Sequence, residues 1–346
     1  MRRLLCCLLI LPMLLPAAFA GEDIAKSAES AVLMDAATGT VIYEKNADRR
    51  ALIASTTKIM TALIALEHAS PGDTLEVPAE AAGIEGSSMY LTAGQQVTVR
   101  DLLYGLMLKS GNDAAAALAI HCAGSVTSFA ELMNQKAAAL GMRGTSFCNP
   151  HGLNAEGHYS TARDMALLTR AALKNEALSQ IVGSKYAKVG GITIKNHNRL
   201  LWSYPGADGV KTGYTANAGR CLVSSATRDG MRLIAVTLND SNDWADHTAM
   251  LDHGFTNYSL LTLYEQGTEI GRIPVLGRGV VPVTVSHTVK VLTPKDESGG
   301  DPVTKMLLPQ YVWPPVLEGQ RVGMMTVELG GKVRAACPLL AGGGGF

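Results

Sequence analysis

Ser55-Thr56-Thr57-Lys58 opens the first strong helical pattern in this chain of 346 residues. Two further strings follow it in order: Ser110-Gly111-Asn112 between two helical stretches, and Lys211-Thr212-Gly213 at the expected start of a strand. Each string alone is short enough to occur by chance in a protein of this length. Their joint occurrence, each on the type of element that its chemistry needs, favours a catalytic site.

The first string brings a hydroxyl and an amine together. Positions i and i+3 share one face of a helix, so Ser55 Oγ and Lys58 Nζ can approach each other. A serine hydroxyl becomes a good nucleophile when a base accepts its proton, and the sequence offers no His–Asp pair at an elbow motif. A lysine can be that base if burial or a nearby cation such as Lys211 keeps its amine neutral. The alternative is an N-cap serine followed by a solvated lysine.

The other two strings supply polar groups for a substrate. A tight glycine turn can present Ser110, which can relay a proton, and Asn112, which can donate to a carbonyl. The cation and hydroxyl of Lys211-Thr212-Gly213 suit a carboxylate, and Gly213 lets an extended peptide approach the sheet edge. Taken alone, the second string is an ordinary turn and the third a surface tripeptide.

Strand patterns at both ends of the larger part of the chain bracket a helical middle. Residues 31–45 predict a hairpin, and residues 99–175 are mostly helical in pattern. Residues 220–226 and 233–238 predict two strands joined by an Asp-Gly turn, and a last helix is expected over 244–255. The economical fold is α+β: one antiparallel sheet formed from the two ends, with the helices inserted between them.

The pattern changes from about residue 264. The period of a strand is followed by Val281, Val283, Val285, Val289 and Val291, and Gly330-Gly331 indicates a further hairpin. The sequence therefore predicts a signal peptide over 1–20, a catalytic domain over 21–262 and a small all-β domain over 263–346.

The chain carries the features of an exported protein. Arg2 and Arg3 precede an apolar run from Leu4 to Leu15, and Ala18-Phe19-Ala20 is a small-x-small cleavage site. We expect cleavage near Ala20; a retained anchor is the alternative. The 30 basic and 30 acidic residues balance without a long basic run, which argues against a nucleic-acid partner.

Cysteines and histidines suggest no cofactor. The mature chain keeps four cysteines, either paired in one of three ways or free. His247 and His253 do not share a helix face, so no metal site is expected. His151 is interpreted as a structural loop residue. The four cysteines are Cys122, Cys148, Cys221 and Cys337.

On these strings the chain resembles the low-molecular-weight penicillin-binding proteins, which are serine-type D-alanyl-D-alanine carboxypeptidases. The resemblance extends over Ser110 to Ala114, His151 to Ala166 and Asn198 to Trp202, and the β tail is similar to the C-terminal domain of that family. It implies a penicillin-binding-protein/β-lactamase-like transpeptidase fold. It also implies peptidoglycan stem peptides as substrates and β-lactams as covalent inhibitors.

The resemblance assigns a role to each matching residue. It makes Ser55 the acyl-ester nucleophile, Lys58 its proton acceptor and Ser110 a proton shuttle. Asn112, Gly213 and the other residues of the third string would bind substrate. Lys211 and Thr212 would hold its terminal carboxylate, and the backbone N–H groups of Ser55 and Tyr214 would form the oxyanion hole.

Two departures from the family are visible. Many members end in an amphipathic helix, which this sequence does not show, so membrane association is open. The stretch from Ala235 to His247 has no arginine where some relatives hold the carboxylate, so recognition is expected to rest on Thr212, Lys211 or Arg199.

Three other functions use related chemistry. A β-lactamase of the class with these strings also needs a Glu-x-x-Leu-Asn string, which does not occur between Asn112 and Lys211. A non-catalytic sensor acylated by β-lactams would need a spanning helix. A D,D-endopeptidase acting on cross-links would use the same site, and the sequence does not separate it from a carboxypeptidase.

Overall fold

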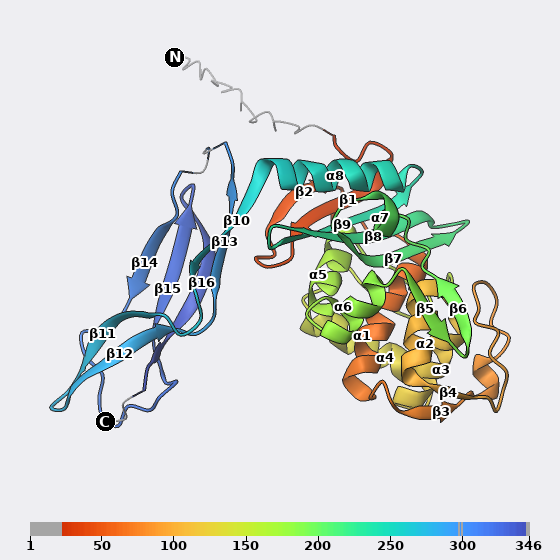
Figure 1. Ribbon diagram of the computed structural model, residues 1–346, viewed down its shortest axis with the longest axis horizontal. Helices are drawn as coiled ribbons and strands as arrows, with labels where there is room; N and C mark the ends of the chain where they lie inside the picture. The colour runs from red at the N-terminus through yellow and green to blue at the C-terminus, as the bar shows by residue number, and fades with distance from the viewer. Residues whose placement is uncertain (1–22, 297, 299, 344–346) are drawn as a thin grey trace, which may run out of the picture.

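The computed structural model describes residues 23–296, 298 and 300–343. The larger part of the molecule is layered, with the early helices on one face of a five-stranded sheet and α8 on the other (Figure 1). The smaller part, formed by the C-terminal residues, consists of strands. The antiparallel α+β fold with inserted helices and an all-β tail is therefore confirmed.

The helical segments are η1 (Ala54–Thr57), α1 (Lys58–His68), η2 (Ala79–Ala81), α2 (Val99–Tyr104), η3 (Gly105–Lys109), α3 (Asn112–Ala123), α4 (Val126–Ala139), α5 (Ala162–Ala172), α6 (Glu176–Gly183), α7 (Leu200–Ser203) and α8 (Asp243–Asn257). The strands are β1 (Ala28–Asp35), β2 (Val41–Lys45), β3 (Thr74–Glu76), β4 (Gln96–Thr98), β5 (Tyr186–Val189), β6 (Ile192–Lys195), β7 (Ala207–Thr215), β8 (Gly219–Arg228), β9 (Met231–Asp240), β10 (Tyr258–Tyr264), β11 (Glu269–Val275), β12 (Gly279–Val285), β13 (Val289–Pro294), β14 (Val303–Leu307), β15 (Arg321–Leu329) and β16 (Lys332–Ala341).

The main sheet joins the two ends of the larger part. Its strand order is β2-β1-β9-β8-β7, and β1 pairs antiparallel with β9. The β8–β9 connection is the expected Asp-Gly turn, in which Asp229 and Gly230 both have positive φ, as that hairpin turn requires. Strand β7, which carries the third string, is an edge strand of this sheet.

The side chains of β1 alternate between two hydrophobic cores, one on each face of the sheet. Val32 and Met34 belong to the core shared with the early helices, whereas Ala31 and Leu33 belong to the core beneath α8. All four side chains are buried. Because burying one large apolar side chain stabilises a protein by about 1.5–3 kcal/mol, packing on both faces fixes the position of the sheet.

Two expectations about local structure were wrong in detail. The regular α-helix begins at Lys58, and Ser55 lies in η1, a single 3-10 turn before it. The third string lies within β7 and not at its start. Both shifts follow from packing between the turn and the strand, which the local pattern of either segment does not contain.

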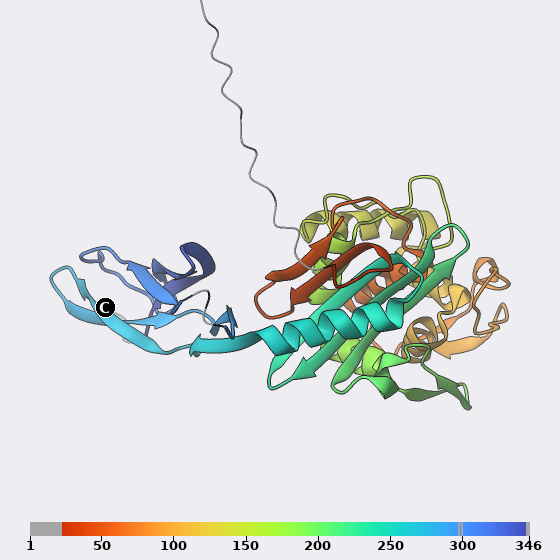
Figure 2. The ribbon, with the colours of Figure 1, turned by 90° about the horizontal axis from the view of Figure 1, so that it is seen from above.

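The C-terminal strands form a separate core. One sheet has the order β11-β12-β16-β15-β14, and β10 pairs with β13. The predicted hairpin at Gly330-Gly331 joins β15 to β16, and the expected boundary at 262/263 falls inside β10. Seen from both directions, these strands lie beyond the C-terminal end of α8, away from the β5–β6 hairpin (Figures 1 and 2).

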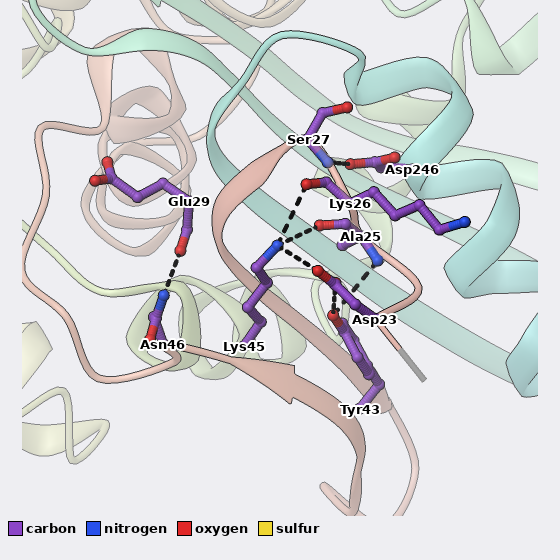
Figure 3. A network of polar contacts seen from close by, with 9 residues as sticks. All are labelled: Asp23, Ala25, Lys26, Ser27, Glu29, Tyr43, Lys45, Asn46 and Asp246. Carbon is purple, nitrogen blue, oxygen red and sulfur yellow. Dashed lines mark hydrogen bonds and ion pairs between the residues drawn. The ribbon is translucent and has the colours of Figure 1, made fainter. Parts of the chain in front are cut away.

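A polar network ties the first described residues to the sheet and to α8 (Figure 3). Lys45 Nζ donates to Asp23 at 2.9 Å and to the carbonyl of Ala25 at 3.0 Å. The backbone nitrogen of Ser27 donates to Asp246 of α8 at 2.8 Å. The expected signal peptide and its cleavage site at Ala20 lie outside the described residues.

Within the described ranges, no single helix is long and apolar enough to cross a membrane. The four cysteines within residues 23–343 are free in the described structure, with Cys148 exposed and Cys221 and Cys337 buried. Burial raises the pKa of Cys221 to about 11, so this thiol remains protonated at neutral pH.

Candidate active site

The turn that carries Ser55 is held by side chains behind it. Thr57 Oγ1 donates to the carbonyl of Ala54 at 2.8 Å and lies 2.9 Å from His158 Nε2. His158 Nδ1 accepts the backbone N–H of Cys148 at 3.0 Å, so its Nε2 carries the proton that Thr57 accepts. Burial lowers the pKa of His158 to about 4. A neutral imidazole therefore ties the serine turn to the following loop.

Lys58 Nζ has three oxygen neighbours. It lies 2.9 Å from Ser55 Oγ, 2.7 Å from Asn112 Oδ1 and 2.7 Å from the carbonyl oxygen of His151. The last two oxygens only accept hydrogen bonds. A neutral amine has two N–H donors and one lone pair, so once it donates to these two acceptors its lone pair faces the Ser55 hydroxyl. This arrangement suits removal of a proton from Ser55.

The surroundings of Lys58 favour that neutral form. Its side chain is buried, and burial, reinforced by the charge of Lys211, holds its pKa well below the usual lysine value; Asp113 opposes this shift. Lys211 is also buried, which lowers its own pKa to about 7. Two lysines with depressed pKa values therefore face the Ser55 region.

The second string has an unusual backbone. It follows η3, a π-helical segment, and Ser110 adopts the left-handed conformation with φ 63°. The tight turn predicted at Gly111 is therefore made by Ser110, since Gly111 has an ordinary φ of −58°. Asn112 Nδ2 donates to the carbonyl of Glu85 at 2.6 Å, which directs Asn112 Oδ1 toward Lys58. In this structure Asn112 Oδ1 accepts a hydrogen bond from Lys58 Nζ.

Gly213 brings β7 against the serine turn. A Cβ built at Gly213 would lie 3.0 Å from the backbone nitrogen of Ser55 and 3.2 Å from Ala54 Cβ. This contact places the edge of the sheet beside the nucleophile turn. Lys211 Nζ donates to the carbonyl of Thr212 at 2.8 Å, and Tyr214 is exposed at the end of the string.

A cleft of about 1340 Å³ joins the three strings. Lys58, Asn112 and Lys211 are buried behind its wall. The expected site residues that line the cleft directly are Ser55, Ser110, Thr212, Gly213 and Tyr214. The structure therefore brings together all eight residues expected at the site.

Sequence reasoning missed the segment that covers one side of this cleft. Ser88, Met89 and Tyr90 line it. The buried carboxylate of Asp113 holds them, because it accepts from Ser88 Oγ at 2.6 Å and from the backbone nitrogen of Met89 at 3.0 Å. Asp113 directly follows the second string, but this long-range contact leaves no periodic signal in residues 85–91.

A second missed residue is Arg220, which lines the cleft from β8. Its position could have been found by extending the β7–β8 pairing, because Tyr214 stands opposite Arg220 in that register.

The histidine considered as a metal ligand lies inside the fold. His247 contacts Ser224 Oγ at 2.6 Å and Thr237 Oγ1 at 3.0 Å. Among the residues that the structure describes, no group of three or more His, Cys, Asp or Glu side chains could hold a metal ion.

Comparison with known families identifies the larger part of the chain. A family described as "D-alanyl-D-alanine carboxypeptidase" matches residues 17–242. The chain belongs to this D-alanyl-D-alanine carboxypeptidase family. A second family, described as "Penicillin-binding protein 5, C-terminal domain", matches residues 258–343.

Carboxypeptidases of this family resemble the chain over nearly its full length. D-alanyl-D-alanine carboxypeptidase DacF of Bacillus subtilis is 38% identical, with 99% of this chain and 94% of that protein covered. DacC of Escherichia coli is 36% identical, covering 94% and 87% respectively. The structure of penicillin-binding protein 5 from Haemophilus influenzae is 31% identical with a TM-score of 0.81, covering 92% of this chain and 97% of that one.

Proposed function

We propose that this protein is a serine-type D-Ala-D-Ala carboxypeptidase that removes the terminal D-alanine from peptidoglycan stem peptides through an acyl-Ser55 intermediate. The observation that carries the proposal is the contact of 2.9 Å between Lys58 Nζ and Ser55 Oγ, made by an amine whose pKa is lowered. Membership of the carboxypeptidase family supports the same reaction.

Acylation begins when Lys58 Nζ accepts the hydroxyl proton of Ser55. Ser55 Oγ then attacks the carbonyl carbon of the penultimate D-alanine, and the backbone N–H groups of Ser55 and Tyr214 stabilise the oxyanion that forms. Collapse of this intermediate breaks the C–N bond. The leaving amine of D-alanine receives the proton from Lys58, relayed by Ser110.

Deacylation uses the same groups in the opposite sense. Water attacks the ester carbonyl and gives its proton to Lys58, and the C–O bond to Ser55 then breaks. Ser55 Oγ recovers a proton from Lys58, which returns the site to its starting state. Thr212 and Gly213 line the cleft where the substrate would extend along the edge of β7.

Partners and location follow from the same proposal. β-Lactams would acylate Ser55 as covalent inhibitors; a similar structure, penicillin-binding protein D2 from Listeria monocytogenes, is an ampicillin-bound form. That protein is 31% identical, its TM-score is 0.61, and the match covers 66% of this chain. We further propose that residues 1–20 direct export and that the enzyme works outside the cytoplasm.

Purified protein lacking residues 1–20 tests the function. It is incubated with a pentapeptide ending in D-Ala-D-Ala, and D-alanine release is measured for the wild type and for Ser55→Ala. A parallel sample with benzylpenicillin is analysed for a covalent mass adduct. We expect turnover and an adduct in the wild type and neither in the variant.

Each other outcome would indicate a different function for this protein. An adduct without peptide turnover would indicate a sensor, and fast hydrolysis of benzylpenicillin would indicate a β-lactamase. Preferential cleavage of cross-linked dimers would indicate an endopeptidase. A protein with neither turnover nor adduct would contradict the proposal.

A further inference from the structure

A carboxypeptidase must distinguish the end of a peptide from its interior, so its site has to recognise a free carboxylate. Thr212 offers only a neutral hydroxyl. Lys211 is buried, and its Nζ already donates to the carbonyl of Thr212 at 2.8 Å. The stretch from Ala235 to His247 has no arginine. Other elements bring further cations to the cleft wall, among them Arg199 and Arg220.

The register of the β7–β8 hairpin brings Arg220 to this position. Thr212 stands opposite Leu222, and Tyr214 stands opposite Arg220. Residues opposite each other, and those two positions along, project from the same face of a sheet. Arg220 is thus the diagonal neighbour of Thr212, at a Cα separation of about 7–8 Å that a long side chain spans. Both residues line the same cleft.

The guanidinium of Arg220 is held in place from one side. Its Nη2 donates to both carboxylate oxygens of Asp243, at 2.7 and 2.9 Å, and its Cζ lies 5.7 Å from the centre of the Trp244 ring. Asp243 is buried with 4% of its side chain exposed, whereas Arg220 keeps 42% exposed. Among the described residues, Nε and Nη1 of Arg220 have no hydrogen-bond partner. A cation fixed by one edge retains donors for an incoming anion.

We propose that Arg220, together with Thr212, holds the carboxylate of the substrate's C-terminal residue, and that Asp243 is the positioning residue for its guanidinium. Arg220 is then the determinant that makes the enzyme act at a free chain end. This inference rests on the proposed acyl-serine function. It replaces the earlier expectation that Lys211 or Arg199 supplies the charge.

Arg199 is the other arginine that could hold the carboxylate. Its Cζ lies 6.0 Å from the same Trp244 ring, and it lines the same cleft. However, it directly precedes α7 and takes no part in the β7–β8 ladder, so no pairing places it beside Thr212. Substituting each arginine in turn separates the two assignments.

The test compares a peptide ending in D-Ala-D-Ala with its C-terminal carboxamide. We expect Arg220→Met to lower kcat/KM for the free acid by about 10- to 100-fold, because a charge-assisted hydrogen bond is lost. The kcat/KM for the carboxamide should change by less than about threefold. Arg220→Lys should restore part of the preference for the free acid over the carboxamide. Arg199→Met should leave this preference intact.

Asp243→Asn tests positioning. Loss of the fixed guanidinium orientation should raise KM for the free acid while kcat and the carboxamide kinetics stay near wild-type values. An equal loss on both substrates in Arg220→Met would overturn the proposal in favour of a structural role. Collapse of the preference in Arg199→Met alone would assign the carboxylate to Arg199.

Acylation by benzylpenicillin and by its methyl ester keeps this test separate from the proposed function. If the wild type failed to turn over peptide, the carboxypeptidase function would fail. The ratio of acid to ester acylation rates would still report on Arg220. A ratio unchanged by Arg220→Met would contradict the role of Arg220 even in a fully active enzyme.

Discussion

The Cβ position of Gly213 lies 3.0 Å from the backbone nitrogen of Ser55, so the edge strand and the nucleophile turn pack more closely than a Cβ contact normally allows. Gly213→Ala should push the two apart and displace the Ser55 N–H from the oxyanion. We expect the rate of benzylpenicillin acylation to fall at least about 10-fold, measured by stopped-flow or mass spectrometry. Gly271→Ala is the control, since a Cβ there meets nothing within 4 Å. An unchanged rate in Gly213→Ala would show that the contact has no catalytic role.

The pH dependence of acylation should report the pKa of Lys58. Acylation needs the neutral amine, so its rate should rise with pH through the pKa of Lys58 and then level off. Burial is the main cause of the lowered pKa, and the charge of Lys211 adds to it. Removing that charge in Lys211→Met should raise the pKa of Lys58 and move the rising limb to higher pH.

Lys109→Met is the control for this shift. Lys109 lines the cleft but does not contribute to the lowered pKa of Lys58. Its removal should leave the limb in place. A limb that stayed at the wild-type pH in Lys211→Met would mean that a group other than Lys58 accepts the proton.

Gly152 packs against the back of the serine turn. A Cβ at this position would lie 1.9 Å from the carbonyl oxygen of Ala54, and Gly152 has φ +86°. Gly157, in the same loop, has φ +82° but a nearest neighbour 3.5 Å away. Both alanine variants carry backbone strain of about 1–2 kcal/mol, and only Gly152→Ala adds the clash. Thermal unfolding should show a clearly larger loss of stability for Gly152→Ala, and equal losses would contradict the close contact.

Thiol reactivity should follow exposure. In the chain without residues 1–20, Cys148 is exposed whereas Cys221 and Cys337 are buried. We expect one rapidly titrated thiol under native conditions, lost in Cys148→Ser, and four after unfolding. Rapid native reaction of Cys221 would mean that β8 opens readily.

Local patterns predicted much of the framework. The hairpin at 31–45 and the β8–β9 turn follow from strand alternation and an Asp-Gly pair, both of which act between near neighbours in sequence. Joining the two ends into one antiparallel sheet is the economical fold for strands that bracket a helical middle. The eight expected site residues came from motifs on these elements.

The details that set the chemistry depend on contacts between distant segments. The left-handed conformation of Ser110 and the 3-10 turn at Ser55 reflect packing that no local preference contains. The sequence from Ala235 to His247, which runs from β9 into the start of α8, contains no arginine. The structure instead offers a cation from the neighbouring strand, anchored by Asp243 at the start of that helix.

Helix α8 begins at the cleft with Asp243 and ends where β10 leads into the C-terminal strands. Its 15 residues span about 22 Å at 1.5 Å per residue. The same helix therefore carries Asp243, which holds Arg220, at its first turn and leads at its last turn into the C-terminal strands, so one rigid element connects the cleft to the β domain.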